Sequence, residues 1–269
     1  MSKESIFFRE NKWLYHFTRF DVAKIIVSTN RLKYSMLSGT NDVCEHARCI
    51  YNLSSLQQTE NICEDIKCEI YNYRQISLSE DKHVFGRKAF DLQQMWGLYA
   101  DKGFGVCLVF DKTEFLESLG DCCYHGEVSY NVELTPDIYT EIENSKDIAS
   151  YIKDNAKTLF FQKRKEWEHE QEYRVVSIFS DQDCEKYHDF ENSLKYVILY
   201  NSRTIKSSDS ILNSVEYKSL KHHLSADVKI LFYSSFLNEQ SLLCYDENQN
   251  FETFWNSSEN YGEISDVNI

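Results

Sequence analysis

Proline and glycine are scarce in this sequence. The chain of 269 residues contains one proline and eight glycines, which leaves little material for flexible linkers between domains. It also lacks a glycine-rich loop of the kind that cradles phosphate groups between a strand and a helix. The sequence therefore predicts one domain that is not built around such a loop.

Positive charge is scarce as well. Lysine and arginine total 29 against 43 acidic residues, so the net charge is −14. A charge of this sign repels phosphate backbones at long range, which argues against long duplex nucleic acid as a partner. The most basic stretch, residues 163–165, is followed at once by alternate glutamates from Glu166 to Glu172, a pattern typical of a charge-paired helix end.

The sequence contains no motif typical of membrane insertion, secretion or metal binding. No apolar run reaches the length of a membrane-spanning helix, and the first residues lack the apolar core of a signal peptide. The nine cysteines are odd in number and contain no CxxC motif, so they indicate reduced thiols and predict no metal site. We expect a cytoplasmic protein that does not enter a membrane.

Hydrophobic residues make up 42% of the chain, enough for a sizeable core. Residue patterns predict strands at 14–18, 32–36, 76–79, 106–110, 127–130, 171–179, 194–200 and 228–233, and helices at 21–30, 90–100, 148–163 and 208–223. This irregular order, without a βαβ period, predicts an α+β fold. We expect the domain at 1–235 and an acidic tail, docked or frayed, at 236–269.

The stretch 167–176 carries the strongest chemical signal. The apolar residues before this stretch recur at helical spacing, and from about Gln171 they recur at every second residue. This change of period predicts a strand with Glu170, Glu172 and Arg174 on one face. A solvated strand end with a surface salt bridge, worth about 0–1 kcal/mol, would explain this row of charges. A carboxylate held by a neighbouring cation at the rim of a pocket would explain it equally well.

Three further candidates have a structural and a functional interpretation each. His16 lies on a predicted strand, where a single histidine is more often structural than functional. The loop at 41–45 has the form of a capping box, with Asp42 before Glu45, but a polar loop at a helix start can also hold an anion or a ribose. Tyr99 fits an apolar helix stripe, although an aromatic ring beside a glycine turn can also stack on a flat ligand.

Four motifs in their order resemble a bacterial family of proteins of unknown function, domain-of-unknown-function family 2971. They are Tyr15-His16-Phe17-Thr18, Asn41-Asp42-Val43-Cys44-Glu45, Met95-Trp96-Gly97-Leu98-Tyr99-Ala100, and Trp167 with Glu170, Glu172, Tyr173 and Arg174. The resemblance spans about residues 13–235. The chain departs from the family pattern at Val43, Leu78 and Leu98, where proline, an aromatic residue and histidine are usual.

The order of His16, Tyr99 and Glu172-Tyr173 also resembles, more distantly, that of ADP-ribosyltransferases. This resemblance implies a core of mostly antiparallel strands with surrounding helices, and NAD as the cofactor. Cleavage of the nicotinamide–ribose bond develops positive charge on the ribose, which a fixed carboxylate stabilises. The resemblance implies that Glu172 is this carboxylate.

The same resemblance implies roles for the remaining residues. His16 would bond the adenosine ribose, Tyr99 would stack on nicotinamide, and Arg174 would keep Glu172 ionised or meet the diphosphate. Glu170 would act as the general base for the acceptor. The implied catalytic set is Glu172, Glu170 and His16, and the implied cofactor-binding set is Tyr15, His16, Thr18, Asn41, Asp42, Tyr99 and Arg174.

The acceptor is left open as a protein, a small molecule or an RNA end. Proteins with such folds often act as toxins or in antiviral defence, so a partner or inhibitor protein would fit this role. An NAD glycohydrolase, with water as the acceptor, would use the same residues. The non-enzymatic alternative is an acidic interaction or sensor module, whose charged face pairs with another protein and which does not bind NAD.

Overall fold

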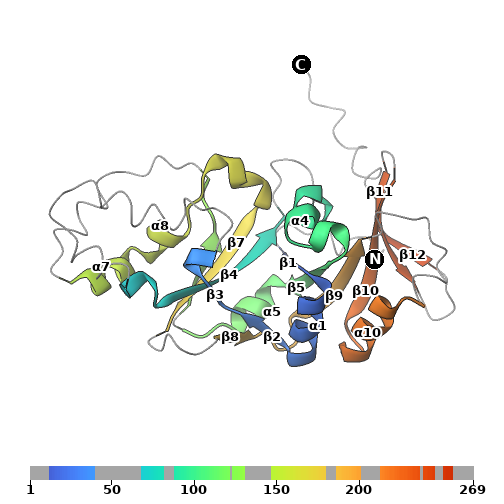
Figure 1. The fold of residues 1–269 in the computed structure, drawn as a ribbon, viewed down its shortest axis with the longest axis horizontal. Coiled ribbons are helices and arrows are strands. Elements are labelled where there is room, and N and C mark those ends of the chain that lie inside the picture. The colour runs from blue at the N-terminus through green and yellow to red at the C-terminus, as the bar shows by residue number, and fades with distance from the viewer. Residues whose placement is uncertain are drawn as a thin grey trace, which may run out of the picture. The chain divides into compact units, whose positions relative to one another are not determined.

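The computed structural model describes residues 12–39, 68–81, 88–121, 123–130, 147–179, 186–200, 213–236, 239–245 and 251–256. The predicted class is confirmed, because helices accompany strands that pair mostly antiparallel. The chain divides into two compact units. Figure 1 labels their helices and strands. No helix among the described residues is long and apolar enough to cross a membrane.

The first unit comprises residues 1–31, 79–118 and 189–269. Its strands are β1 (Trp13–Thr18), β5 (Val106–Asp111), β9 (Leu194–Tyr200), β10 (Lys229–Phe236), β11 (Glu239–Tyr245) and β12 (Phe251–Asn256). They pair in the order β12-β11-β10-β9-β5-β1, antiparallel except for the parallel pair of β9 and β10. All six residues of β5 are buried, as its continuous apolar sequence predicts.

Helices accompany the strands of the first unit. They are α1 (Phe20–Thr29), η4 (Ala89–Asp91), α4 (Gln93–Leu98), η5 (Asp101–Gly103), α5 (Lys112–Glu117) and α10 (Val215–His223). α1 lies against α10 (Figure 1). Local chemistry fixes the ends: Asn30 closes α1 in the left-handed conformation, and Asp111 accepts the backbone N–H groups of Thr113 and Glu114 at the start of α5.

The second unit comprises residues 32–78 and 119–188. Its elements are β2 (Arg31–Lys33), β3 (Ser35–Met36), η2 (Leu37–Gly39), β4 (Tyr73–Glu80), β6 (Cys123–Glu127), α7 (Ile148–Asp154), α8 (Ala156–Phe160), η6 (Lys165–Glu170), β7 (Glu172–Ile178) and β8 (Tyr187–Asp189). The end residues Arg31 of β2 and Asp189 of β8 belong to the first unit. The strand β7 lies between β4 and β6, β3 pairs with β4, and β2 pairs with β8. The last two residues of β4, Ser79 and Glu80, belong to the first unit and pair there with β1.

Each unit has its own apolar core. In the first, rings and aliphatic side chains from β1, α4, β5, β9 and β10 pack together, among them the fully buried Trp13 and Trp96. In the second, α7 and α8 bury Ile152, Ala156 and Phe160 against β7 and β4. These two helices follow the helical spacing predicted for the segment.

Two local predictions were wrong. The helix predicted to reach residue 163 breaks at Asn155 and ends at Phe160. The strand predicted at 127–130 ends at Glu127. Part of the segment predicted as a docked or frayed tail forms β11, which pairs with β10, and β12. The boundary between residues 235 and 236 stays a prediction.

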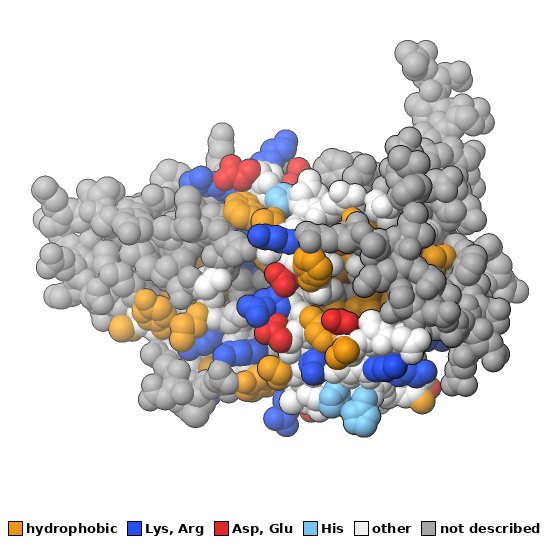
Figure 2. All heavy atoms as spheres, turned by 45° about the vertical axis from the view of Figure 1, so that its right-hand side comes forward, with side chains coloured by type: hydrophobic (Ala, Val, Ile, Leu, Met, Phe, Trp, Pro, Cys, Tyr) orange, Lys and Arg blue, Asp and Glu red, His pale blue; other side chains and the backbone are white. Residues whose placement is uncertain are grey.

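On the face shown in Figure 2, the described acidic and basic side chains are interspersed. Hydrophobic side chains occur between them in small groups. No large field of one sign is visible among the described side chains on that face, although the whole chain carries a net charge of −14.

Candidate functional site

The predicted site residues fall into three sets. Tyr15, His16 and Thr18 lie on β1 and Tyr99 caps α4, all in the first unit. Glu170, Glu172 and Arg174 lie in the second unit. Asn41 and Asp42 lie outside the described residues. The predicted convergence of the three sets stays a prediction.

The Tyr15 hydroxyl makes a buried hydrogen bond. Its ring is fully buried in the core of the first unit, and its hydroxyl donates to Asp81 Oδ2 at 3.0 Å. Lys88 Nζ and the Ala89 N–H donate to the same carboxylate, each at 2.9 Å. Burial raises the pKa of Tyr15, and the charge of Asp81 raises it further. These contacts give Tyr15 a structural role in joining β1 to the residues around Asp81.

The end of β1 lies close to the turn that follows α4. A side chain on Gly105 would place its Cβ 2.2 Å from the Thr18 carbonyl oxygen and 2.8 Å from Ala100 Cα, so only glycine fits there. Within this turn, Asp101 and Lys102 both have positive φ angles, 47° and 56°. Neither residue is glycine, so this backbone is strained.

His16 lies in β1, and Tyr99 directly precedes this turn in the chain. His16 is half-buried and pairs across the sheet with Leu108. Tyr99 is half-buried and packs against the core of the first unit. Both side chains have other contacts within the protein, so their predicted roles toward a cofactor are neither supported nor contradicted by their positions.

The second unit contains a buried charge cluster, made of Lys163, Glu170, Glu172 and Arg174. The four residues are between 0% and 4% exposed. Arg174 donates from Nε to Glu172 Oε1 and from Nη2 to Glu172 Oε2, both at 2.8 Å. Lys163 Nζ lies 2.8 Å from Glu172 Oε2 and 2.5 Å from Glu170 Oε2. The burial excludes the solvated strand end as an explanation for this row of charges.

The backbone explains how these four residues meet. Glu170 ends η6, and Gln171 takes a left-handed conformation with φ 47°, so the chain turns before Glu172 begins β7. Glu172 and Arg174 are two residues apart on β7, as the period of two predicts. Glu170 joins the cluster because Lys163 bridges the carboxylates of Glu170 and Glu172. The sequence had predicted instead that Glu170 shares a strand face with Glu172 and Arg174.

Residues 128–130 hold the cluster from another side. The Val128 N–H donates to the Glu172 carbonyl, and the Lys163 N–H donates to the Ser129 carbonyl, both at 2.9 Å. The Glu172 N–H donates to the Tyr130 hydroxyl at 2.8 Å. Arg174 Nη1 also donates to the Phe160 carbonyl at the end of α8. The backbone on both sides of the cluster is therefore fixed by hydrogen bonds.

The cluster is electrically balanced, with two cations and two carboxylates. Burial alone would raise the pKa of Glu172, but the charges of Arg174 and Lys163 and their hydrogen bonds outweigh it, so this pKa lies well below its ordinary value. Glu172 is therefore ionised throughout the physiological pH range. Burial also raises the pKa of Tyr130, which keeps its hydroxyl neutral.

The Glu172 carboxylate retains acceptor capacity. An ionised carboxylate has about four acceptor positions, two on each oxygen. Within the part of the chain that the structure describes, Oε2 accepts from both Arg174 and Lys163, whereas Oε1 accepts only from Arg174. One position on Oε1 thus remains for a hydroxyl group. The side chain is 2% exposed, so an external hydroxyl can reach it only if the surrounding residues open.

Sequence reasoning missed two members of this arrangement. The sequence predicts Lys163 at the charge-paired end of a helix, yet it lies beyond α8 and bridges two carboxylates. A lysine that falls in register with an apolar stripe was the available signal, since a buried ammonium needs anionic partners. Nothing local in the sequence marks Tyr130, because its contact with Glu172 joins residues 42 positions apart.

Comparisons with known proteins give one result. The model of a family described as "Protein of unknown function (DUF2971)" matches residues 95–175. No curated protein and no solved structure matches the chain. The matched range contains Met95-Trp96 and the charged stretch from Trp167 to Arg174 but not the motifs at 15–18 and 41–45. The match supports the predicted resemblance to this family across residues 95–175.

Proposed function

We propose that the protein cleaves the nicotinamide–ribose bond of NAD and transfers ADP-ribose to an acceptor. The observation that supports this proposal is the state of Glu172, which is fixed by Arg174 on both oxygens and is ionised. A carboxylate that is already ionised and oriented stabilises a developing ribosyl cation without reorganising during the reaction. The remaining acceptor position on Oε1 would take a ribose hydroxyl.

The bond changes of the proposed reaction are simple. The bond between the ribose C1′ and the nicotinamide nitrogen breaks, and its electron pair leaves with nicotinamide. A nucleophile on the acceptor forms the new bond to C1′ and loses a proton, for which Glu170 is the proposed base. In the structure Glu170 accepts from Lys163, so the base would have to exchange this ion pair for contact with the acceptor.

Burial supports one alternative and opposes another. Glu170 and Glu172 are 3% and 2% exposed, and water needs less room beside them than a protein side chain does, so NAD glycohydrolase is the second candidate. The interaction-module alternative requires the same charges to face a partner protein. Their burial in ion pairs within this chain counts against that alternative.

The test measures nicotinamide release from NAD by the purified protein, with and without a cell lysate as the source of acceptor. Glu172→Gln would leave Arg174 with a neutral partner inside the protein, at a cost of about 3–5 kcal/mol, so unfolding could mimic loss of catalysis. Glu172→Asp is the better variant, because it keeps the negative charge and withdraws it by one methylene, about 1.5 Å.

We expect nicotinamide release by the wild type and a loss of at least about 100-fold in Glu172→Asp, as for misplacement of a catalytic group by about 1 Å. Circular dichroism and thermal unfolding must show that the variant is folded. Release that needs lysate would identify a transferase, and release without lysate a glycohydrolase. Absence of nicotinamide release under both conditions, or full activity of a folded Glu172→Asp protein, would refute the proposal.

A further inference from the structure

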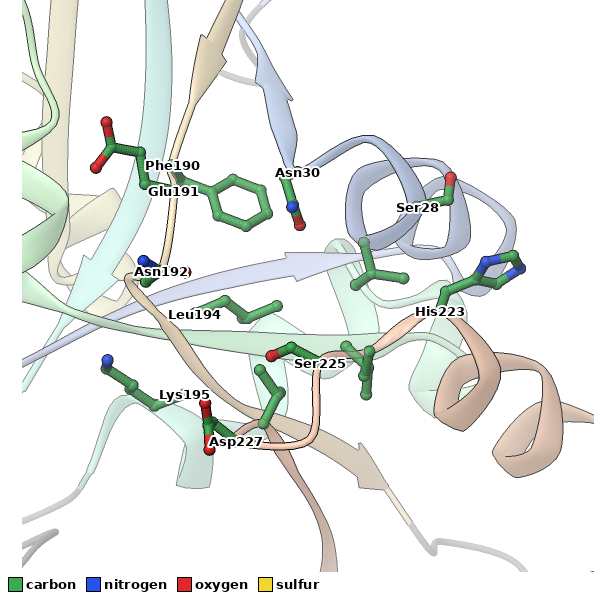
Figure 3. Close-up of a pocket in the computed structure, with 13 residues that line it drawn as sticks. Ser28, Asn30, Phe190, Glu191, Asn192, Leu194, Lys195, His223, Ser225 and Asp227 are labelled. Atoms are coloured by element: carbon green, nitrogen blue, oxygen red, sulfur yellow. The ribbon is translucent and has the colours of Figure 1, made fainter.

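The first unit contains a hollow of about 370 Å³ that the proposed NAD chemistry does not use. Three segments line it: the end of α1 with Asn30, the turn between β8 and β9, and the link from α10 to β10. Its volume lies within the range of about 300–1,000 Å³ that is typical of small-molecule sites. Figure 3 shows the hollow and its lining residues.

The lining of the hollow is part polar and part apolar. Val27, Phe190 and Leu194 line the hollow and are 3%, 1% and 6% exposed, so these nearly covered apolar side chains close its bottom. Two uncharged polar residues of the lining, Asn30 and Ser225, are exposed to solvent. In Figure 3 the Asn30 amide and Ser225 extend toward the space between them from opposite sides.

Neither polar group is engaged elsewhere in the described chain. The backbone of Asn30 is bonded, since its N–H donates to Ile26 and its carbonyl accepts from Phe190. Among the contacts within the described ranges, none involves the Asn30 amide or the Ser225 hydroxyl. The amide thus offers a donor next to an acceptor, which is the pair that matches the edge of another amide or of a nucleobase.

The charged lining residues do not face the interior. Glu191, Lys195 and His223 point outward in Figure 3. Lys195 is also neutralised by Glu114, at 2.7 Å. Asp227 adds a further negative charge to the lining. Among the described lining residues, the lysine is thus ion-paired and points outward, so the hollow favours an uncharged molecule over a phosphate or a carboxylate.

We propose that this hollow binds a small uncharged molecule that combines a flat apolar ring with an amide-type hydrogen-bonding edge, such as an aromatic carboxamide or a nucleobase. The ring would cover the apolar floor, and the edge would pair with the Asn30 amide. Ser225 would bond the opposite side of the ligand.

The probes are nicotinamide and adenosine, each with an anionic counterpart of similar ring, nicotinate and AMP. Binding to the full-length protein is measured by calorimetry and by ligand-observed NMR. Asn30→Gly removes the amide and keeps the left-handed backbone, which glycine adopts without strain. Glu191→Gly is the matched control, because Glu191 is also left-handed, with φ 49°, and its side chain points away from the hollow.

We expect saturable binding of at least one uncharged probe with a Kd below about 10 mM, and weaker binding of its anionic counterpart. Asn30→Gly should lower the affinity for the uncharged probe by about five- to tenfold, the effect of one or two lost hydrogen bonds. Glu191→Gly should bind this probe with the affinity of the wild type. Equal binding of the charged and uncharged members, an unaffected Asn30→Gly protein, or no saturable binding would overturn the proposal. Because Glu172→Asp does not touch this hollow, unchanged nicotinamide binding in that variant separates this site from the proposed NAD chemistry.

Discussion

Replacement of Lys163 by methionine tests the buried charge cluster most directly. The ammonium group of Lys163 bridges Glu170 and Glu172, and its side chain is 5% exposed. Methionine has a similar length and is apolar, so the packing of the stem is largely kept. The four-residue cluster then changes from neutral to a net charge of −1, because two carboxylates remain against Arg174.

The expected magnitude follows from this imbalance. Removing one partner of a buried ion pair leaves an uncompensated charge and costs about 3–5 kcal/mol. We expect Lys163→Met to lower the free energy of unfolding by that amount at pH 7. The double variant Lys163→Met/Glu170→Gln restores neutrality, since Glu172 and Arg174 still pair, and should lose only about 1–2 kcal/mol. The second substitution should thus recover part of the stability that the first removes.

Urea unfolding followed by circular dichroism measures these differences, with Glu170→Gln alone completing the cycle. A second signature is the pH dependence. The deficit of Lys163→Met should shrink as the pH falls toward about 5, because a buried carboxylate without its cation takes up a proton more readily in the folded state. A loss below about 1 kcal/mol for Lys163→Met, or a double variant no more stable than the single one, would show that these charges are not buried and coupled.

Three other outcomes follow from the structure. Gly105→Ala should destabilise by about 2–3 kcal/mol in urea unfolding, because its Cβ would meet backbone atoms at 2.2 and 2.8 Å, whereas Gly97→Ala, with nothing within 4 Å, should be neutral or stabilising. Asp81→Asn should cost about 2–4 kcal/mol by thermal unfolding, because Lys88 and two other donors lose a buried anion; a change under about 1 kcal/mol would contradict this. The lowered pKa of Glu172 contributes stability above its unfolded value of about 4.3, so this contribution should be lost as the pH falls below that value; a wild type equally stable at about pH 3 and pH 7 would exclude it.

Local periodicity predicts most strands of this fold because their burial is uniform or alternates. The apolar run at 106–110 becomes β5, buried along its whole length, and the alternation after Gln171 becomes β7. Helix ends were harder to predict. The amphipathic pattern passes through Asn155, yet the side-chain amide of Asn155 bonds the Tyr151 carbonyl at 2.9 Å and the helix breaks there, a competition that apolar spacing does not reveal.

At the candidate site, too, the sequence pattern predicts only contacts between residues that are close in the chain. The pairing of Glu172 with Arg174 could be predicted because two residues on one strand face are neighbours. The role of Lys163 could not be predicted, because its bridge to Glu172 depends on the hydrogen bonds that residues 128–129 make with Lys163 and with β7. The burial of all four charges could not be predicted either, because nothing in a sequence of alternating charges distinguishes a solvated row from a paired and buried one.

The energetics of this cluster make stability an insufficient reason for its presence. A buried, balanced set of ion pairs can often be replaced by apolar residues of similar volume with no loss of stability, because desolvation offsets the attraction between the charges. Lys163, Glu170, Glu172 and Arg174 therefore do not need to be charged for the second unit to fold. They do need to be charged to hold Glu172 as an ionised, oriented carboxylate with an acceptor position on Oε1. For this reason the proposed function rests on Glu172 rather than on the fold.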